Sequence, residues 1–462
     1  MYKKLHLLSK VCILVSLPLI LNASNINPFA VNNGEIPTKM QYDGPLWKFK
    51  YNYPTTYVNP SMPWRDVLKG KPLSKDNAYN YIMTLKKYIS PSIKNLILDP
   101  KKWNTSSQKG WYSMLWAGQE VKIKVGDKEE NIWDGRDSIY GTYTGQVINK
   151  SVYAKSGLKV DIQNHATIYY NEAAAYTLHN VWKNCDEKTK KCIPSISNNE
   201  AQFKEGAIVI KAAGVNASPE EWPVLEGAAK WQIFRKPFND KNAKPKVIDL
   251  RVGIFDIIVK DSIASPKTGW VFTTLVYDKD AKGNAWDKMI PLGAMWGNDP
   301  AINSEKEPLS PLIETYINPL APAYSTVTLG YGNRLSGPFD IAVKYNVEID
   351  GKKVKELRSS SCLSCHGTSV YPGDLTFFYP AKDPNQNPWE MYTPGSKEWN
   401  EWFQNRNGTT PQSNKKGAIA LDYSTFLEAV LMNYASTLDT NKNSNSNMFV
   451  KWKKYRQLRQ NY

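Results

Sequence analysis

The sequence predicts an α+β fold in which a β-rich body, an antiparallel sheet or sandwich, precedes a mostly irregular and helical C-terminal segment. Residues 205–350 hold several runs rich in β-branched and aromatic residues, with Gly, Pro and Asp between them. Helical spacing of apolar residues occurs before and after this region. A content of 41% hydrophobic and 12% aromatic residues excludes a disordered or membrane-embedded chain. The length of 462 residues suits two or three domains, or one large domain with an appended module.

Residues 1–23 have the pattern of a signal peptide. Three lysines precede the apolar run Val11–Leu21, and a small residue, Ala23, ends the segment. We expect cleavage after Ala23 and export to the periplasm; an uncleaved anchor is the alternative, although the run is short for a bilayer span. Cleavage lowers the formal net charge from +16 to +13, because the segment holds three lysines and no acidic residue.

Residues 24–204 are expected to form a mixed region that wraps around the body. Apolar residues recur every three or four positions from Asn77 to Ile93, which predicts a helix. The alternation from Leu158 to Ile162 predicts a strand. A second helix is expected from Glu172 to Lys183, with His179 on its inward face.

Residues 205–350 form the predicted β-rich domain. The expected strands are Ala207–Lys211, Val247–Val259, Gly269–Asp278 and Ile341–Ile349. The segment from Pro291 to Pro300 is dense in Gly, Pro, Trp and Met, which predicts a loop. It could line the edge of a ligand site or be a buried structural loop.

Residues 351–438 hold the irregular and helical segment. Lys352 to Ser360 leaves room for only a short helix, and a longer helix is expected from Thr425, with Glu428 completing a capping box. Residues 439–462 form a linker followed by a basic, aromatic tail. That tail could lie on an anionic membrane or a partner, or dock as a terminal helix on its own protein.

Within 351–438, Cys362 and Cys365 are followed directly by His366 in a C-x-x-C-H motif. Two thiols at this spacing can each form a thioether to a haem vinyl group, and the adjacent histidine can then bind the iron as its proximal ligand. We therefore expect one covalent haem c, and 351–438 is interpreted as a cytochrome c-like segment. A C-x-x-C disulfide, a redox pair or half of a zinc site are the alternatives. A complete zinc site needs two more nearby ligands, and no other Cys or His follows Val354.

The second axial ligand of the iron has several candidates. Met391 and Met432 lie C-terminal to the motif, whereas His179 and His165 come from the first half of the chain. Each of these residues could equally be ordinary core filling. The ligand decides the function, because electron-transfer haems usually have both axial positions filled and catalytic haems usually leave one open.

Three classes of function are compatible with a haem at this motif. Periplasmic electron transfer is favoured, because other catalytic signatures such as H-E-x-x-H, G-x-S-x-G or a P-loop are absent from the sequence. A peroxidase-like or oxidase-like haem enzyme and a haem-based sensor are the alternatives. The basic mature chain suits an acidic redox partner, or simply solubility, while nucleic acid is excluded by the compartment.

The remaining cysteines are interpreted by their compartment. Cys12 leaves with the signal peptide, and Cys185 and Cys192 flank a polar turn. Outside the cytoplasm a disulfide between them is expected; free thiols or a surface metal pair are the alternatives. The bridge is a loop staple rather than a site.

Several patches across the mature chain together resemble a family of largely uncharacterised exported mono-haem cytochrome c proteins. Similar patches are Trp111–Trp116, Gln163-Asn164, Tyr170-Asn171, Tyr176–Leu178, Trp270–Phe272, Val276–Asp278, Met295–Pro300 and Ser360–His366. The resemblance implies haem c at Cys362, Cys365 and His366 in a periplasmic protein. It implies no particular reaction. Positions matching His165 and His179 need not be histidine in such proteins, which disfavours both as iron ligands.

Overall fold

The computed structural model describes residues 27–119, 121–125, 128–133, 135–197, 199–240, 242–304, 306–307, 310–327, 329–336, 343–349, 351–358, 360–374, 382 and 390–438. The predicted signal peptide and the basic tail lie outside these residues. None of the described helices has both the length and the apolar character needed to cross a membrane.

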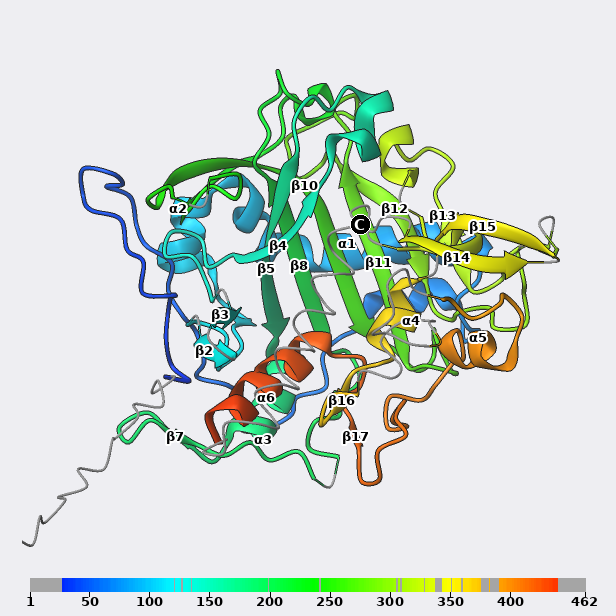
Figure 1. The fold of residues 1–462 in the computed structure, drawn as a ribbon. Coiled ribbons are helices and arrows are strands. Elements are labelled where there is room, and N and C mark those ends of the chain that lie inside the picture. Colours follow the sequence, from blue (N-terminus) through cyan, green and yellow to red (C-terminus); the bar gives the residue numbers. More distant parts are fainter. Residues whose placement is uncertain are drawn as a thin grey trace, which may run out of the picture.

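A nine-stranded antiparallel sheet forms the centre of the described part of the chain (Figure 1). Its strands follow the order β1-β5-β8-β10-β11-β12-β13, while β4 pairs with β5 and β9 with β10. The strands are β1 (Trp111–Tyr112), β4 (Tyr143–Ile148), β5 (Ile162–Asn171), β8 (Ile208–Val215), β9 (Lys230–Arg235), β10 (Lys246–Lys260), β11 (Trp270–Tyr277), β12 (Met289–Met295) and β13 (Thr315–Ile317). This sheet confirms the predicted α+β class with a β-rich antiparallel body.

Both faces of the sheet are covered, as β11 shows most clearly. All eight of its residues are buried. Trp270 and Phe272 belong to one hydrophobic core, whereas Val271 and Leu275 belong to the core on the opposite face. A strand covered on both faces reads as a continuous apolar run, because neither set of alternating side chains meets water.

The strand predictions on β8, β10 and β11 are confirmed, with shifts of a few residues at their ends. Two others need correction. The predicted strand Leu158–Ile162 is misplaced in the sequence, since β5 begins only at Ile162, the last residue of the prediction. The predicted loop Pro291–Pro300 is wrong in its first half: Pro291 to Met295 belong to β12, which pairs with β11 and β13. Strands from both sides of the boundary placed between residues 204 and 205 belong to the one sheet.

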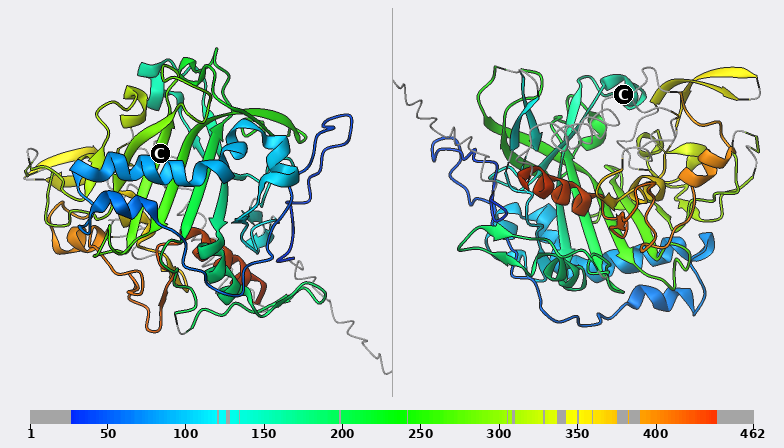
Figure 2. Two further views of the ribbon diagram at one scale, coloured as in Figure 1. Left: turned by 180° about the vertical axis from the view of Figure 1, so that it is seen from behind. Right: turned by 60° about the horizontal axis from the view of Figure 1, so that its bottom comes forward.

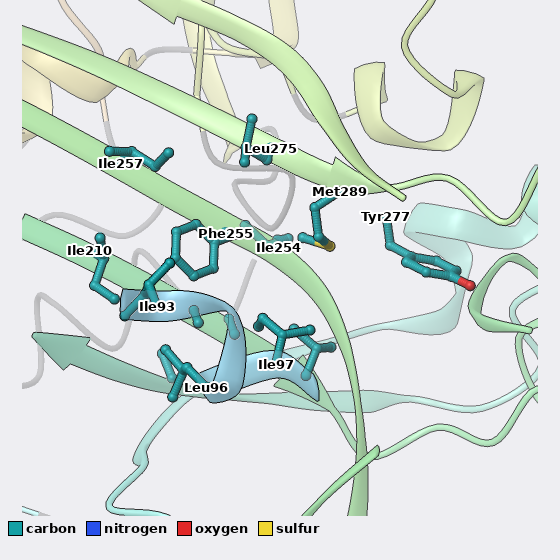
Figure 3. Close-up of a cluster of buried hydrophobic side chains, with 14 of the residues drawn as sticks. Ile93, Leu96, Ile97, Ile210, Ile254, Phe255, Ile257, Leu275, Tyr277 and Met289 are labelled. Atoms are coloured by element: carbon teal, nitrogen blue, oxygen red, sulfur yellow. The ribbon is translucent and has the colours of Figure 1, made fainter. Parts of the chain in front are cut away.

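Helix α1 (Lys75–Leu98) crosses one face of the sheet, as the rear view in Figure 2 shows. It starts at a capping box in which Ser74 N donates to Asn77 Oδ1 at 2.8 Å. Ile93, Leu96 and Ile97 face the strands, and Figure 3 shows them beside side chains of the sheet. The helix is longer at both ends than the predicted Asn77–Ile93: the cap at Ser74 sets its start, and burial of Leu96 and Ile97 extends its end.

The opposite face is covered by α3 (Glu172–Trp182), α6 (Thr425–Leu438) and α4 (Cys362–His366). Figure 1 shows α6 and α4 in front of the sheet, with α4 near β11, and α3 at the lower end of the strands. The predictions of helices from Glu172 and from Thr425 are both confirmed. Together these helices and the sheet enclose the second core, which includes Phe272, Leu363 and Leu427.

Shorter elements complete the described chain. The predicted short helix between Lys352 and Ser360 is wrong: the segment is strand β15, paired with β14 in a separate hairpin. The strands outside the main sheet are β2 (Val121–Val125), β3 (Lys128–Trp133), β6 (Cys185–Asp186), β7 (Lys191–Cys192), β14 (Val343–Ile349), β15 (Lys352–Leu357), β16 (Val370–Tyr371) and β17 (Ile419–Ala420). The short helices are η1 (Pro63–Leu68), α2 (Pro100–Lys102), η2 (Trp103–Ser107), η3 (Lys150–Ser156), η4 (Pro223–Leu225), η5 (Ala323–Thr326), η6 (Tyr331–Asn333) and α5 (Lys397–Trp402).

Candidate functional site

The C-x-x-C-H motif folds into the single helical turn α4. Ser361 is its N-cap: its Oγ accepts from Ser364 N at 3.0 Å, and Ser364 Oγ accepts in return from Ser361 N at 2.8 Å. Residues three apart in a helix lie on the same side, so the turn places Cys362 and Cys365 together. Both are partly exposed. A larger group could therefore reach both sulfurs at once.

The imidazole of His366 is oriented by a backbone carbonyl. Its Nδ1 lies 2.9 Å from Tyr423 O. A carbonyl oxygen can only accept, so Nδ1 carries the proton, and in the neutral ring the lone pair then belongs to Nε2. The imidazole and the ring of Phe272 on β11 form a T-shaped pair, with 4.8 Å between the ring centroids. Histidines that bind metals usually have their second nitrogen fixed in this way.

Tyr423 is brought to His366 by the pairing of β16 with β17. Val370 pairs with Ala420, and Leu421 N donates to Ser369 O at 3.0 Å. The chain that leaves the motif and the chain that enters α6 therefore run side by side. This return is a tertiary feature with no local signal in the sequence.

Asp422, next to Tyr423, is a buried carboxylate with several donors. Lys260 Nζ lies 2.7 Å from Oδ1 and 3.0 Å from Oδ2. Trp270 Nε1 donates to Oδ1 at 2.7 Å, and Phe203 N donates to Oδ2 at 2.8 Å. The carboxylate thus joins the turn before α6 to the sheet and to the loop before β8.

A second polar network holds the other end of α4. The Ser361 hydroxyl donates to Asn298 Oδ1 at 2.5 Å, and Cys362 N donates to Leu335 O at 2.9 Å. Asn298 lies in the segment from Trp296 to Pro300 and is itself buried. Asn298 Oδ1 therefore ties this segment to the motif, in line with the structural alternative for it.

Arg334 organises this network from a fully buried position. Its guanidinium donates to four carbonyl oxygens at 2.7–3.0 Å, those of Asn298, Asp299, Ile302 and Tyr331. Burial lowers the pKa of Arg334 to about 10, which is still high enough for the guanidinium to be charged at neutral pH. It ties the loop after β12 to the segment that precedes the motif.

The axial-ligand candidates occupy different places. Met432 is buried on α6, where its sulfur accepts from Gly373 N at 3.4 Å, and Met391 is also buried. His179 is half-buried beside the buried face of α3, and burial, followed by nearby Lys183, lowers its pKa. Its helix contacts β1, β5 and β8, whereas His366 packs on β11, two positions further along the sheet. Met391 and Met432 therefore stay as predictions, and His179 is disfavoured.

His165 is a core histidine on β5. It is 2% exposed, and burial, reinforced by Arg235, lowers its pKa to about 3. Its Nδ1 has no hydrogen-bond partner among the described residues. β5 lies three positions from β11 in the sheet order, so this side chain belongs to another part of the core.

The predicted disulfide is present. Cys185 and Cys192 form a disulfide that closes a short hairpin between β6 and β7. Trp116 Nε1 lies 3.2 Å from Cys192 Sγ. The bridge is apart from the motif and is confirmed as a structural feature.

Three buried polar atoms close to α4 have no hydrogen-bond partner in the part of the chain that the structure describes. They are Asn298 Nδ2, Ser369 Oγ and Gln412 Nε2. No described group of three His, Cys, Asp or Glu side chains is arranged to hold a metal ion. The motif is therefore a site with one imidazole and two thiols, surrounded by hydrogen-bonding groups that could serve a bound molecule.

Comparisons with known proteins give no match: no protein-family model, no curated protein and no solved structure is detectably similar to this chain.

Proposed function

We propose that the protein is a periplasmic c-type cytochrome that holds one covalent haem and transfers electrons. The observation that carries the proposal is the hydrogen bond from His366 Nδ1 to Tyr423 O, which leaves the lone pair on Nε2. Together with two neighbouring thiols on one helical turn, this gives the donor set that a haem c requires.

The surroundings of the motif fit such a group. Phe272 and Leu363 supply apolar contacts beside His366, and the buried N–H of Gln412 is suited to a carboxylate or another acceptor. A zinc site fits less well, since the described residues offer no third and fourth ligand beside the motif.

Each protein group would have a separate task. Cys362 and Cys365 would anchor the haem as thioethers, and His366 would bind the iron through Nε2. The haem, when bound, supplies a one-electron couple. The Tyr423 carbonyl would keep the imidazole in one orientation, and the apolar wall formed by Phe272 would exclude water from that side of the ring.

Export supports the same assignment. The disulfide Cys185–Cys192 is typical of an oxidising compartment, in agreement with the predicted signal peptide. The expected net charge of +13 on the mature chain would steer an acidic redox partner toward it. The basic tail could add a peripheral membrane contact.

The proposal is tested by expressing the exported chain together with a haem c attachment system. The denatured protein should retain one haem per chain, which a pyridine haemochrome spectrum measures. Replacing both Cys362 and Cys365 by Ala should abolish this retention, and His366→Ala should change the spectrum of the native protein. Native ligation that survived His366→Ala would contradict the axial assignment.

The spin state then separates the classes of function. A six-coordinate low-spin ferric spectrum supports electron transfer. A high-spin spectrum with peroxide turnover would favour a haem enzyme, and spectral shifts on ligand addition without turnover would favour a sensor.

A further inference from the structure

We propose that Asp422 is a positioning residue that holds the Tyr423 carbonyl against His366 and, together with Lys260, sets the reduction potential of the iron. The inference rests on the proposed function, because it concerns the protein side of the same site. It assigns a task to a buried ion pair that no motif in the sequence reveals.

The first support is the anchoring of the carboxylate. Asp422 receives hydrogen bonds from Lys260 Nζ, Trp270 Nε1 and Phe203 N, and its side chain has no exposed surface. Lys260 ends β10 and Trp270 begins β11, so two strands of the rigid sheet hold the carboxylate in place. Trp270 and Phe272 are two residues apart on β11, so their side chains point to the same face of the sheet and belong to the same core. The strand that fixes Asp422 therefore also carries the ring that packs on His366.

The second support is the backbone of the turn. Asp422 and Tyr423 have φ values of +46° and +66°, a left-handed conformation that disfavours side chains with a Cβ. Each such residue costs on the order of 1 kcal/mol or more and persists only where its surroundings hold it. The bonds to the Asp422 carboxylate supply that restraint. On the other side, Tyr423 Oη donates to Arg406 O at 2.8 Å.

Close packing gives a third support. A Cβ at Gly408 would lie only 1.7 Å from Asp422 Oδ1, so only glycine fits there. The carboxylate is thus enclosed by backbone on one side and by the lysine and the indole on the other. Because the turn cannot shift without breaking these contacts, the carbonyl of Tyr423 stays aimed at Nδ1 of His366.

The pair also has an electrostatic effect. Lys260 and Asp422 carry opposite charges and largely cancel at a distance, but each alone would act strongly in a buried site. A positive charge left near the iron disfavours the ferric state and raises the reduction potential. A negative charge left there lowers it.

Two single variants test the proposal. Asp422→Asn keeps the size of the side chain and leaves Lys260 without its anion, so the midpoint potential should rise. A tenfold change in the redox equilibrium constant against a reference couple is expected, which is about 59 mV for a one-electron couple. Lys260→Met should shift the potential in the opposite direction. Shifts of the same sign in both variants would indicate general disruption, and no shift in either would remove the electrostatic role; both outcomes overturn the proposal.

A haem-free measurement tests the positioning separately. The mature chain has three histidines, His165, His179 and His366, so ¹⁵N-labelled histidine gives few signals. In the Cys362→Ala, Cys365→Ala protein, His366 should be the Nδ1–H tautomer, and adding Asp422→Asn should shift it toward the Nε2–H tautomer. An unchanged tautomer would contradict the positioning role.

Folding and function can be told apart in this design. If Asp422→Asn does not fold, the double variant Lys260→Gln, Asp422→Asn keeps a neutral hydrogen-bonding pair, and its potential should lie closer to the wild type than that of Lys260→Met. The reverse order would overturn the electrostatic role. If the wild type takes up no haem, the proposed function fails, while the tautomer measurement still decides whether Asp422 positions the carbonyl.

Discussion

The hydroxyl of Ser361 donates to the side-chain oxygen of Asn298, 63 positions earlier in the sequence, at 2.5 Å. This bond joins the N-cap of the helical turn with the two cysteines to the loop that follows β12. The polar segment and the cysteine motif, which are far apart in sequence, are therefore one structural unit.

Replacing Ser361 by Ala should destabilise the protein by about 1 kcal/mol, since the N-cap and the bond to Asn298 are both lost. Urea unfolding measures the change. Ser369→Ala is the matched control: its hydroxyl is also buried near α4 but has no partner among the described residues, so little loss is expected. Equal losses in both variants would argue against a specific role of the cap.

Arg334→Lys should cost more than about 2 kcal/mol, because a single ammonium cannot reach the four carbonyl oxygens that the planar guanidinium satisfies. Unfolding in denaturant would measure it. Lys267→Ala is the control in the same network. That lysine is largely exposed beside Glu314, and its loss should change stability by less than about 1 kcal/mol. A tolerated Arg334→Lys would refute the argument.

The lowered pKa of buried His165 predicts that the protein loses stability in acid. Its folded pKa of about 3 lies below the ordinary value of 6.5, so between these pH values the unfolded chain binds a proton that the folded chain does not. Its contribution to the unfolding free energy should therefore fall with decreasing pH by at most about 1.4 kcal/mol per unit. The difference between wild type and His165→Gln, followed from pH 7 to pH 4, isolates the effect. The half-buried His179, replaced in the same way, should show a smaller difference; a flat difference for His165 would contradict its burial as a neutral ring.

The disulfide Cys185–Cys192 should contribute about 2–3 kcal/mol by restricting the unfolded chain. Replacing both cysteines by Ser should lower the denaturant midpoint, and reduction of the wild type should have the same effect. Haem retention should not change, because the bridge is apart from α4. Loss of haem in this variant would be unexpected on the present assignment.

Electron exchange should depend on salt if the net charge steers partners. The second-order rate with an anionic redox reagent should fall as ionic strength rises, and the rate with a cationic reagent should rise. Stopped-flow measurement at two or three salt concentrations is sufficient. Identical salt dependence for both reagents would show that the lysines are dispersed and serve solubility.

Much of the body was predictable because its elements have strong local patterns. The β-branched and aromatic runs of β8, β10 and β11 appear as strands in the sequence and in the structure. The errors fall where tertiary contacts decide. β12 contains Pro291 and Gly293, which suggest a loop, yet its neighbours β11 and β13 hold it as a strand. Ala175, Leu178 and Trp182 of α3 are buried as their helical spacing predicts, whereas His179, on the same predicted face, is half-buried.

The sequence by itself determined the chemistry of the motif, because Cys362, Cys365 and His366 are contiguous and their spacing on one helical turn is a local property. It also determined the antiparallel β-rich body. Only the tertiary structure decided what surrounds the imidazole. The Tyr423 carbonyl, the Asp422 carboxylate, Lys260 and Trp270 come from distant parts of the chain, and a backbone carbonyl has no residue-specific signal. The Tyr423 carbonyl reaches His366 because β16 pairs with β17, and Lys260 and Trp270 at the ends of β10 and β11 hold the neighbouring Asp422.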